Sequence, residues 1–531
     1  MRGADIVMEV LSEQGVTHVF GYPGAAVLEL YDALYTHSSR ICHTLTVHEQ
    51  GAAHAADGYA RASGKTGVVI ATSGPGATNL VTGLAAAYMD STPLVCITGN
   101  VRRDRIGRDS FQEVYTAGIT LPITKHNFVV REIEKLADTL RNAFRIAESG
   151  RKGPVLVDIP RDISQAEGEF ISRVRKQEPT PALDQNAIAQ VTEKIARAER
   201  PLLLYGGGAA NASAQLRRLI ESGFPACHTL MGTGLADDLG MIGMHGRASV
   251  NRAAAECDLL LAVGTRFSDR VALDFQNFAP KAARIQIDID PSEKNKNVRM
   301  DTFLLGDAGT VLSALADAIQ SVNCPAWHET LAAWQKQDPA GDALPQAMME
   351  IIARVGGADA IWTTDVGQHQ LWAAMSGMRC HPRTFLTSGG LGAMGFGYGA
   401  AIGAQRAHPD ATVLHLTGDA SFHMNLAECA TAVRYGLPIV SIVFNNNALG
   451  LVRQYQHQIC ADRFSESLPG WKTDFAAVAR GFGAVGYHAG TPEELQQVLS
   501  QAIAARLPAV IECRIDPALQ ALPYDKDAPL D

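Results

Sequence analysis

The sequence predicts an α/β protein built from three doubly wound parallel-sheet domains. Short apolar segments such as TGVVIAT, GPVLVDI, DLLLAVG and TVLHLTG alternate with helix-like segments along the whole chain. Near-continuous apolar strands of this kind are typical of parallel sheets that helices cover on both faces. The chain of 531 residues is too long for a single core, and at roughly 100–200 residues per domain it gives two or three domains.

The domain boundaries are expected where this alternation stops. The stretches KQEPTPALDQNA (176–187) and NCPAWHETLAAWQKQDPAGDALP (323–345) are polar and contain proline, as connecting segments do. We therefore predict domains at residues 1–175, 188–322 and 345–520. The first and last share a local order of glycine turn, helix, proline, strand and polar tip. This order indicates a duplicated fold, although ordinary α/β organisation alone could produce it.

Composition and charge exclude several classes of protein. The 46 basic and 55 acidic residues give a net charge of −9, and without a large basic cluster nucleic acid is not an expected partner. The opening MRGADIVMEVLSEQG is interrupted by acids, and no run of about 18 apolar residues follows, so neither a signal peptide nor a membrane span is expected. Nine cysteines without a CxxC pair argue against a disulfide framework or a zinc site. We predict a cytoplasmic protein.

An acid and an amide end two neighbouring predicted strands. Asp419 follows the strand VLHLTG, and Asn446 follows the strand IVSIVFN. The carboxyl ends of parallel strands meet at the edge where such sheets bind ligands. A carboxylate and an amide oxygen suit Mg²⁺ completed by phosphate oxygens, and the backbone of Gly418, Ala420 and Ser421 would face that negative charge. Alternatively, Asp419 begins a capped helix and the asparagines form a solvated turn.

At this point the sequence resembles the thiamine-diphosphate motif, in which a glycine-aspartate pair is followed, one helix and one strand later, by paired asparagines. The resemblance implies that the backbone carbonyl of Ala448 is a third Mg²⁺ ligand beside Asp419 and Asn446. It also requires a carboxylate that hydrogen-bonds the aminopyrimidine ring of thiamine diphosphate. Glu49 in HEQGAAHAADGYAR corresponds to that acid, although taken alone it could equally cap a helix.

Ordered motifs extend the resemblance to nearly the whole chain. GYPG, HEQGAA, ATSGPGATNL, DSFQEV, TKHNF, IGMHGRASVN, VGTRFSDRV, TTDVGQHQLWAA, SGGLGAMGFG and GLVRQYQ occur in the order found in the acetohydroxyacid synthase (acetolactate synthase) family. The chain is similar to the catalytic subunit of that family. The resemblance implies a pyrimidine-binding first domain, a central FAD-binding-like domain and a third domain that binds diphosphate and Mg²⁺. It also implies a homodimer or homotetramer in which Glu49 and Asp419 meet across a subunit interface. A small regulatory subunit is left open.

The resemblance assigns further residues to the site. Gln112 corresponds to an active-site glutamine, Arg270 to the arginine that holds the second keto acid, and Tyr455 to an acceptor-specificity position that is tryptophan in many relatives. The residues expected to contact thiamine diphosphate are Val366, Gly367, Gln368, His369, Gly392, Met394, Gly418, Ala420, Ser421, Leu449, Gly450 and Leu451. The residues expected to contact FAD are Gly207, Gly208, Thr229, Leu230, Gly243, His245, Gly246, Arg247, Arg266, Asp288 and Asp307.

Each of these assignments has an ordinary structural alternative. His369 could be a polar loop residue, Met394 a core residue and Arg270 a surface ion-pair partner, and the glycine turns are common in α/β domains that bind no nucleotide. The sequence also departs from the family pattern, because Ala25 replaces the second glycine of GYPGG and Ala420 replaces the last glycine of GDG.

The implied function is that of an acetohydroxyacid synthase. Such an enzyme decarboxylates pyruvate and joins the product to pyruvate or 2-ketobutyrate, in branched-chain amino acid biosynthesis, with thiamine diphosphate, Mg²⁺ and a structural FAD. Another thiamine-dependent 2-keto acid decarboxylase or carboligase is the alternative within the enzymes. A FAD/NAD oxidoreductase would explain the glycine turns but not the pairing of Asp419 with Asn446.

Overall fold

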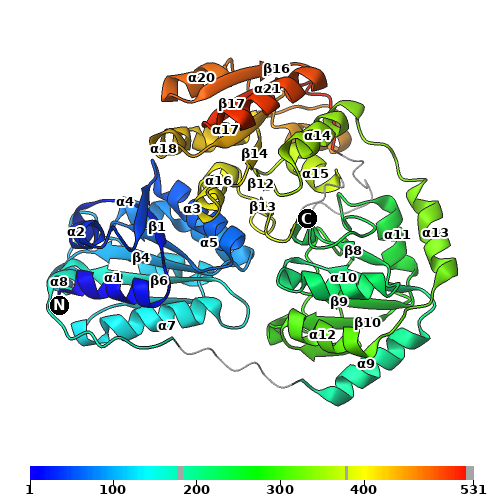
Figure 1. Ribbon diagram of the computed structural model, residues 1–531, viewed down its shortest axis with the longest axis horizontal. Coiled ribbons are helices and arrows are strands. Elements are labelled where there is room, and N and C mark those ends of the chain that lie inside the picture. The colour runs from blue at the N-terminus through cyan, green and yellow to red at the C-terminus, as the bar shows by residue number, and fades with distance from the viewer. Residues whose placement is uncertain (176–182, 377–380, 522–531) are drawn as a thin grey trace.

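Three all-parallel sheets organise the computed structural model of the chain, which describes residues 1–175, 183–376 and 381–521. This arrangement confirms the predicted fold class (Figure 1). We call the regions built on these sheets the first, central and third domains. Part of the predicted boundary at 176–187 lies outside the described residues.

The first domain has a six-stranded sheet in the order β2-β1-β3-β4-β6-β5. Its strands are β1 (His18–Tyr22), β2 (Cys42–Leu45), β3 (Gly67–Ala71), β4 (Leu94–Asn100), β5 (His126–Val129) and β6 (Pro154–Pro160). Its helices are α1 (Gly3–Glu13), α2 (Leu28–Thr36), α3 (Glu49–Ser63), α4 (Pro75–Asn79), α5 (Val81–Met89), α6 (Thr116–Thr120), α7 (Leu136–Glu148) and α8 (Arg161–Gln165). Every residue of β3, β4 and β6 is buried, as expected for strands that helices cover on both faces.

The central domain has a five-stranded sheet in the order β11-β10-β9-β7-β8. Its strands are β7 (Pro201–Tyr205), β8 (Ala226–His228), β9 (Leu259–Val263), β10 (Ala283–Asp288) and β11 (Thr302–Leu305). Its helices are α9 (Gln185–Arg197), α10 (Ser213–Glu221), α11 (Ala248–Glu256), α12 (Ala308–Ala318) and α13 (Pro325–Gln335). Helix α13 lies in the stretch predicted to separate two domains, yet its Trp327 and Leu331 are buried in the central core. The domain boundaries themselves stay predictions.

The third domain repeats the strand order of the first. Its sheet runs β13-β12-β14-β15-β17-β16, which is the order of the first sheet when each is numbered from its own start. The duplicated plan expected from the sequence therefore appears in the topology. The strands are β12 (Ile361–Thr364), β13 (Phe385–Thr387), β14 (Val413–Gly418), β15 (Ile439–Asn445), β16 (Val485–Ala489) and β17 (Ala509–Arg514). The helices are α14 (Ala343–Gly356), α15 (Gln368–Met375), α16 (Phe396–Ala407), α17 (Asp419–Asn425), α18 (Cys429–Arg434), α19 (Gly450–Ile459), α20 (Phe475–Phe482) and α21 (Pro492–Ala505).

The first and third domains contact each other through α3 and α16, which lie side by side between the two sheets (Figure 1). Glycines allow this close approach. A Cβ at Gly58 would overlap the backbone of Ala400, and a Cβ at Gly403 would overlap the backbone of α3. The buried Glu428 adds a polar contact, because its carboxylate accepts hydrogen bonds from the backbone amides of Val47 and His48. The start of α3 is thereby fixed against the third domain.

The helix expected after Asp419 is interrupted. A 3₁₀ turn (Leu426–Glu428) separates α17 from α18, and Met424 near the end of α17 is 58% exposed. The break accompanies two inward-facing polar groups, since Asn425 donates to the Gly395 carbonyl and Glu428 accepts from the first domain. No helix within the described ranges is long and apolar enough to cross a membrane.

Candidate active site

A pocket of about 100 Å³ lies at the carboxyl ends of β14 and β15. The described residues that line it are Val366, Gly367, Gln368, His369, Trp372, Met394, Gly418, Asp419, Ala420, Ser421, Phe444, Asn446, Ala448, Leu449, Gly450, Leu451, Val452 and Ile515. The structure thus brings together the three predicted metal ligands and all but one of the residues predicted to contact thiamine diphosphate. The exception is Gly392, which is exposed and does not line the pocket.

Strand pairing explains why two distant motifs meet here. β14 and β15 are parallel neighbours with Gly418 opposite Phe444. Asp419 therefore begins α17 beside the point where the chain leaves β15 at Asn446. This is the sheet edge at which the sequence predicted ligand binding.

Asp419 is a buried acid in an unusual electrostatic setting. It is 3% exposed, and burial raises its pKa to about 7. The groups that oppose this rise are backbone amides, among them those of Ala420 and Ala448, rather than cationic side chains. A buried carboxylate is costly unless it is paired or coordinates a metal. A divalent cation would supply the missing positive charge, so the residue fits a metal site.

The loop after β15 presents the other two predicted metal ligands. The Asn446 side-chain oxygen accepts a hydrogen bond from the Ala448 backbone amide at 3.1 Å, and its amide nitrogen lies 3.4 Å from the side-chain oxygen of Gln368. An amide oxygen has two acceptor positions, so Asn446 keeps one for a cation. Gly450 is required by this packing, because a Cβ there would overlap the Gln368 side chain.

His369 also lines the pocket, and it carries a buried polar atom that a ligand would satisfy. Burial lowers its pKa to about 4, so the imidazole is neutral. Among the described residues, its Nε2 atom has no hydrogen-bond partner although it is buried. Buried polar atoms almost always have a partner, and a diphosphate oxygen or a water held by it would provide one. A Cβ at Gly418 would lie 3.3 Å from this ring, so glycine keeps the space between them open.

A buried pair, Asp365 and His415, lies behind the pocket residues near His369. This pair was not identified from the sequence. Asp365 accepts hydrogen bonds from the Gly397 amide at 2.8 Å and the Thr417 hydroxyl at 2.6 Å, and its carboxylate lies 3.1 Å from His415 Nε2. Burial acts to raise the pKa of Asp365, but the hydrogen bond and charge of His415 outweigh it and hold the pKa below its usual value. The only sequence signal was a histidine inside the apolar strand VLHLTG.

Glu49 lies in the first domain, apart from this pocket. It begins α3, is 8% exposed and accepts a hydrogen bond from the Asn79 side chain at 2.9 Å. The SGPG turn lies beside it, since a Cβ at Gly76 would be 3.2 Å from its carboxylate. Gln112 reaches the same turn, with its Cα 2.9 Å from the position of a Cβ at Gly74. The first-domain motifs therefore converge, but Glu49 is not among the described residues that line the pocket.

Comparison with known proteins decides the family. Residues 1–119, 188–315 and 365–513 match the N-terminal TPP binding domain, the central domain and the C-terminal TPP binding domain of the thiamine pyrophosphate enzymes. The chain is 44% identical to the probable acetolactate synthase large subunit of Methanocaldococcus jannaschii, over 98% of this chain and 93% of that protein. It is 44% identical to the acetolactate synthase isozyme 2 large subunit of Escherichia coli, over 97% of this chain and 96% of that protein.

The chain belongs to the acetolactate synthase family of thiamine pyrophosphate enzymes. The identification made from the sequence is thereby confirmed, in preference to another thiamine-dependent decarboxylase or carboligase. The pocket of the third domain lies within the C-terminal TPP binding domain, and Glu49 lies within the N-terminal one.

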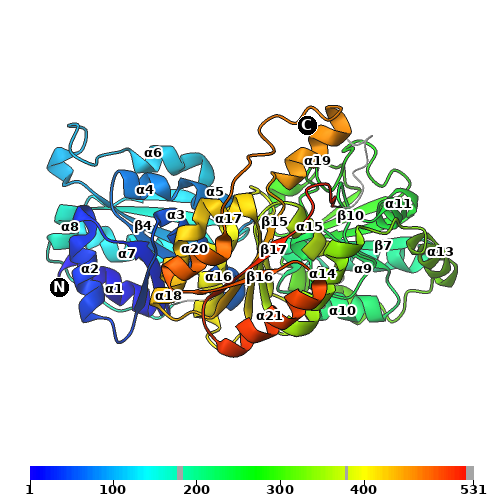
Figure 2. The same cartoon turned by 90° about the horizontal axis from the view of Figure 1, so that it is seen from above.

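In this acetolactate synthase family member, the two residues predicted to contact the acceptor keto acid approach each other between domains. Tyr455 on α19 packs with Leu273 against Met244 of the central domain, and its hydroxyl hydrogen-bonds His245 Nε2 at 2.9 Å. A guanidinium nitrogen of Arg270 lies 2.9 Å from the Met244 sulfur. Figure 2 shows α19 beside the central domain. Met244 is a further residue that could not be assigned from the sequence. Its contacts with Tyr455 and Arg270 in the folded chain identify it.

The residues predicted to contact FAD lie at the carboxyl edge of the central sheet. Most of them follow β7 (Gly207, Gly208), β8 (Thr229, Leu230), β9 (Arg266) and β11 (Asp307). Asp288 is the last residue of β10, and the loop before α11 supplies the rest (Gly243, His245, Gly246, Arg247). Within the described part of the chain, His245 Nδ1 is buried without a partner, which fits a ligand there. Two of the residues also have structural roles, since Asp307 caps α12 and a Cβ at Gly208 would lie 2.7 Å from Gly264.

Proposed function

We propose that this acetolactate synthase decarboxylates pyruvate and joins the two-carbon product to a second 2-keto acid. Pyruvate as acceptor gives 2-acetolactate, and 2-ketobutyrate gives 2-aceto-2-hydroxybutyrate, both used in branched-chain amino acid biosynthesis. The observation that carries the proposal is the pocket where Asp419, Asn446 and Ala448 converge beside His369. Family membership supplies the reaction class.

Asp419, Asn446 and the Ala448 carbonyl would hold Mg²⁺, which prefers oxygen ligands and retains phosphate oxygens among them. The first backbone amides of α17 would face the diphosphate, where the helix start favours negative charge. Bound thiamine diphosphate supplies a nucleophilic carbon and an electron sink for 2-keto acid chemistry. The chain's own task is to bind and orient it, and Met394, which lines the pocket, would supply an apolar contact to it.

Glu49 would hydrogen-bond the aminopyrimidine ring and hold a proton for cofactor activation. Gln112, brought close by the SGPG turn, would orient the substrate. Arg270 would pair with the carboxylate of the second keto acid, because its side chain is half exposed and a guanidinium nitrogen lies 2.9 Å from the sulfur of Met244, against which Tyr455 packs. These roles are proposals that the geometry supports.

We propose a homodimer as the smallest active unit, with a homotetramer as its extension. The pocket of one chain is lined by third-domain residues, and its volume of about 100 Å³ is well below the roughly 300–1,000 Å³ typical of small-molecule sites. The Glu49 that completes this site would then come from the second chain of the dimer. Phe111, Tyr115 and Leu121 of the first domain are 85%, 76% and 69% exposed, and clustered exposed apolar side chains mark interaction surfaces.

The relatives are named large subunits, and this supports a smaller regulatory partner for the chain. FAD in the central domain is likewise a proposal, supported by the glycine turns and the unpartnered His245 Nδ1 within the described ranges. The flavin would be structural, because joining two keto acids with loss of CO₂ involves no net oxidation or reduction.

The proposed function has a direct assay. Purified protein is mixed with pyruvate, thiamine diphosphate, Mg²⁺ and FAD, and acetolactate and acetaldehyde are both quantified. We expect acetolactate as the main product, and omission of thiamine diphosphate should abolish it. Acetaldehyde without acetolactate would instead indicate a simple decarboxylase.

Tyr455 is expected to weaken the preference for the larger acceptor. Its hydroxyl is held by His245, and its ring is smaller than that of tryptophan, so it should contact the extra methyl of 2-ketobutyrate less well. One methylene in an apolar pocket is worth about 1–3 kcal/mol at most. We predict a preference for 2-ketobutyrate over pyruvate below about tenfold, rising several-fold in Tyr455→Trp.

The ratio of the two acetohydroxy acids formed in a competition assay measures this preference. Tyr455→Phe is the matched control, because it keeps the ring and removes only the hydroxyl that bonds His245. If the tryptophan variant leaves the ratio unchanged, or the phenylalanine variant changes it equally, the ring size of Tyr455 does not select the acceptor.

A further inference from the structure

Glu512 is a buried acid that the proposed mechanism does not use. It lies in β17, between β15 and β16, and is 0% exposed. One carboxylate oxygen accepts hydrogen bonds from the Asn445 side-chain amide at 2.9 Å and from Arg514 Nε at 3.1 Å, and the other accepts one from the Phe475 backbone amide at 2.9 Å. Burial of a carboxylate is costly unless such partners compensate it. Of these partners, Asn445 is the one that leads toward the candidate site.

Asn445 connects this acid to the proposed metal loop. It is the last residue of β15, and its side-chain oxygen accepts a hydrogen bond from the Asn447 backbone amide at 3.1 Å. Its own carbonyl accepts one from the Ile515 amide at 3.0 Å. The amides of Asn447 and Ala448 in turn face the Asp419 carboxylate. A continuous series of contacts thus runs from Glu512 through Asn445 to the loop that carries Asn446.

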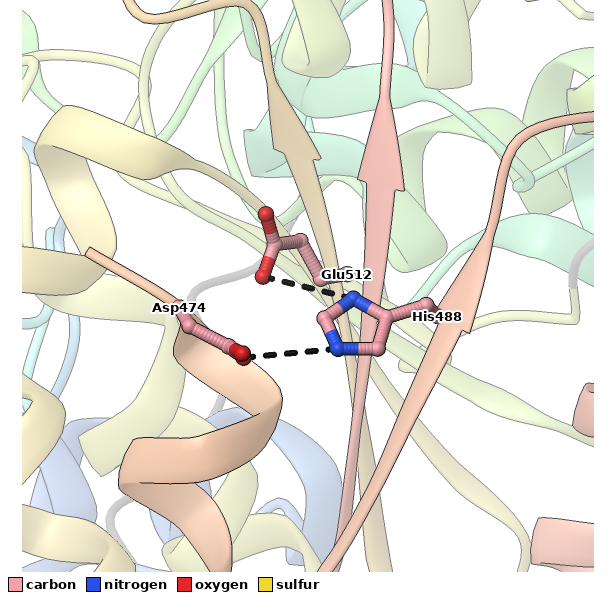
Figure 3. A group of neighbouring side chains, drawn as sticks. All are labelled: Asp474, His488 and Glu512. Atoms are coloured by element: carbon pink, nitrogen blue, oxygen red, sulfur yellow. Dashed lines mark ion pairs between the residues drawn. The ribbon is translucent and has the colours of Figure 1, made fainter. Parts of the chain in front are cut away.

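On its outer side Glu512 belongs to a group with His488 and Asp474 (Figure 3). His488 Nδ1 lies 3.7 Å from Glu512 and His488 Nε2 lies 3.4 Å from Asp474. The imidazole therefore stands between the two carboxylates with one nitrogen facing each. Asp474 also caps α20 by accepting from the Ala477 amide. These contacts connect Glu512 to β16 and to the start of α20.

We propose that Glu512 is a positioning residue that holds the loop 446–448 in the geometry required by Mg²⁺. The inference rests on the proposed function, which places Mg²⁺ at this loop. The three donors that reach Glu512 need acceptors, and a neutral amide in its place would present an NH₂ group to at least one of them. Asn445 would then lose its fixed orientation, and the loop amides and the Asn446 oxygen would shift with it.

The identity of the metal provides a readout that a merely structural role would not change. Mg²⁺ demands near-ideal octahedral geometry, whereas Ca²⁺ accepts longer and more variable coordination. Loss of loop positioning should therefore weaken Mg²⁺ binding more than Ca²⁺ binding. A general loss of stability would lower the melting temperature without changing the ratio of the two affinities.

The test titrates the full chain, saturated with thiamine diphosphate, with Mg²⁺ and separately with Ca²⁺ by calorimetry. We expect Glu512→Gln to raise the Mg²⁺ dissociation constant about 10- to 100-fold, the usual effect of losing a group that orients a metal ligand, with a smaller rise for Ca²⁺. Asn445→Ala should reproduce the change, and the double variant should show less than the sum of the two effects. If Glu512→Gln does not fold, Asn445→Ala decides the question.

Asp474→Asn is the matched control. Asparagine remains a good helix cap, and the change alters the outer ion-pair group without touching Asn445, so the Mg²⁺ dissociation constant should stay at the wild-type value. An unchanged Mg²⁺ affinity in Glu512→Gln, or an equal loss in Asp474→Asn, overturns the positioning role. Failure of the wild-type protein to bind Mg²⁺ at all would instead overturn the proposed function, and this inference with it.

Discussion

Glu49→Gln is expected to lower the rate of acetolactate formation by roughly 10²-fold or more, within the range of general acid–base effects. Glutamine keeps the size of the side chain, and its carbonyl oxygen can still accept the hydrogen bond from Asn79. The start of α3 is fixed independently, because Glu428 bonds the amides of Val47 and His48. The variant should therefore fold normally and bind the cofactor, but it lacks the anion that would activate the pyrimidine ring.

Two measurements separate activation from binding in this variant. Exchange of the cofactor's C2 proton, followed by NMR, should slow in parallel with turnover, while the dissociation constant of thiamine diphosphate should change little. Asn79→Ala provides a comparison that leaves the carboxylate in place. Wild-type proton exchange in Glu49→Gln would remove Glu49 from the mechanism.

The second large effect is expected for Asp419→Asn. The change removes the anionic Mg²⁺ ligand, so the affinities for Mg²⁺ and thiamine diphosphate should fall by at least the roughly 10- to 100-fold seen for residues that only support a ligand. Without cofactor the variant should be no less stable than wild type. Burial raises the pKa of Asp419, and within the described ranges backbone amides rather than cationic side chains compensate its charge, so its removal ends an electrostatic cost.

Calorimetric titration of Asp419→Asn with thiamine diphosphate at several Mg²⁺ concentrations tests this expectation. The melting temperature of the cofactor-free protein serves as the folding control. Wild-type cofactor affinity at limiting Mg²⁺ would show that the motif has been assigned wrongly, and a collapse of stability in the cofactor-free variant would show that Asp419 is a structural residue.

The sequence was informative where function depends on strand ends. Asp419 and Asn446 follow adjacent parallel strands, so their proximity could be predicted from two apolar runs and the turns that follow them. The shared local order of the first and last domains likewise indicated a duplicated fold, and the two sheets have the same strand order. The positions of residues at strand ends and the order of elements can be predicted from the sequence because each depends on a few consecutive residues.

Features that depend on contacts between distant segments could not be predicted in this way. Glu512 and Asn445 are 67 positions apart, and each looks like an ordinary strand residue until the two strands pair. The same holds for Asp365 with His415, and for Tyr455, whose partner His245 lies in another domain. The domain boundaries, the cytoplasmic location and a role for Gly392 stay predictions.

The central claim is that one active site is formed by Glu49 of one subunit and the Asp419 pocket of another. Co-expression of Glu49→Gln and Asp419→Asn chains, with purification of the mixed assembly through two different tags, tests it directly. In a mixed dimer with twofold symmetry, one site receives both altered residues and the other receives neither. When the two chains pair at random, about half of the dimers are mixed, so the unfractionated sample should show about a quarter of wild-type acetolactate synthesis. The purified mixed dimer should show about half. No activity beyond that of the two separate variants would contradict the claim and place both residues in a site within one chain.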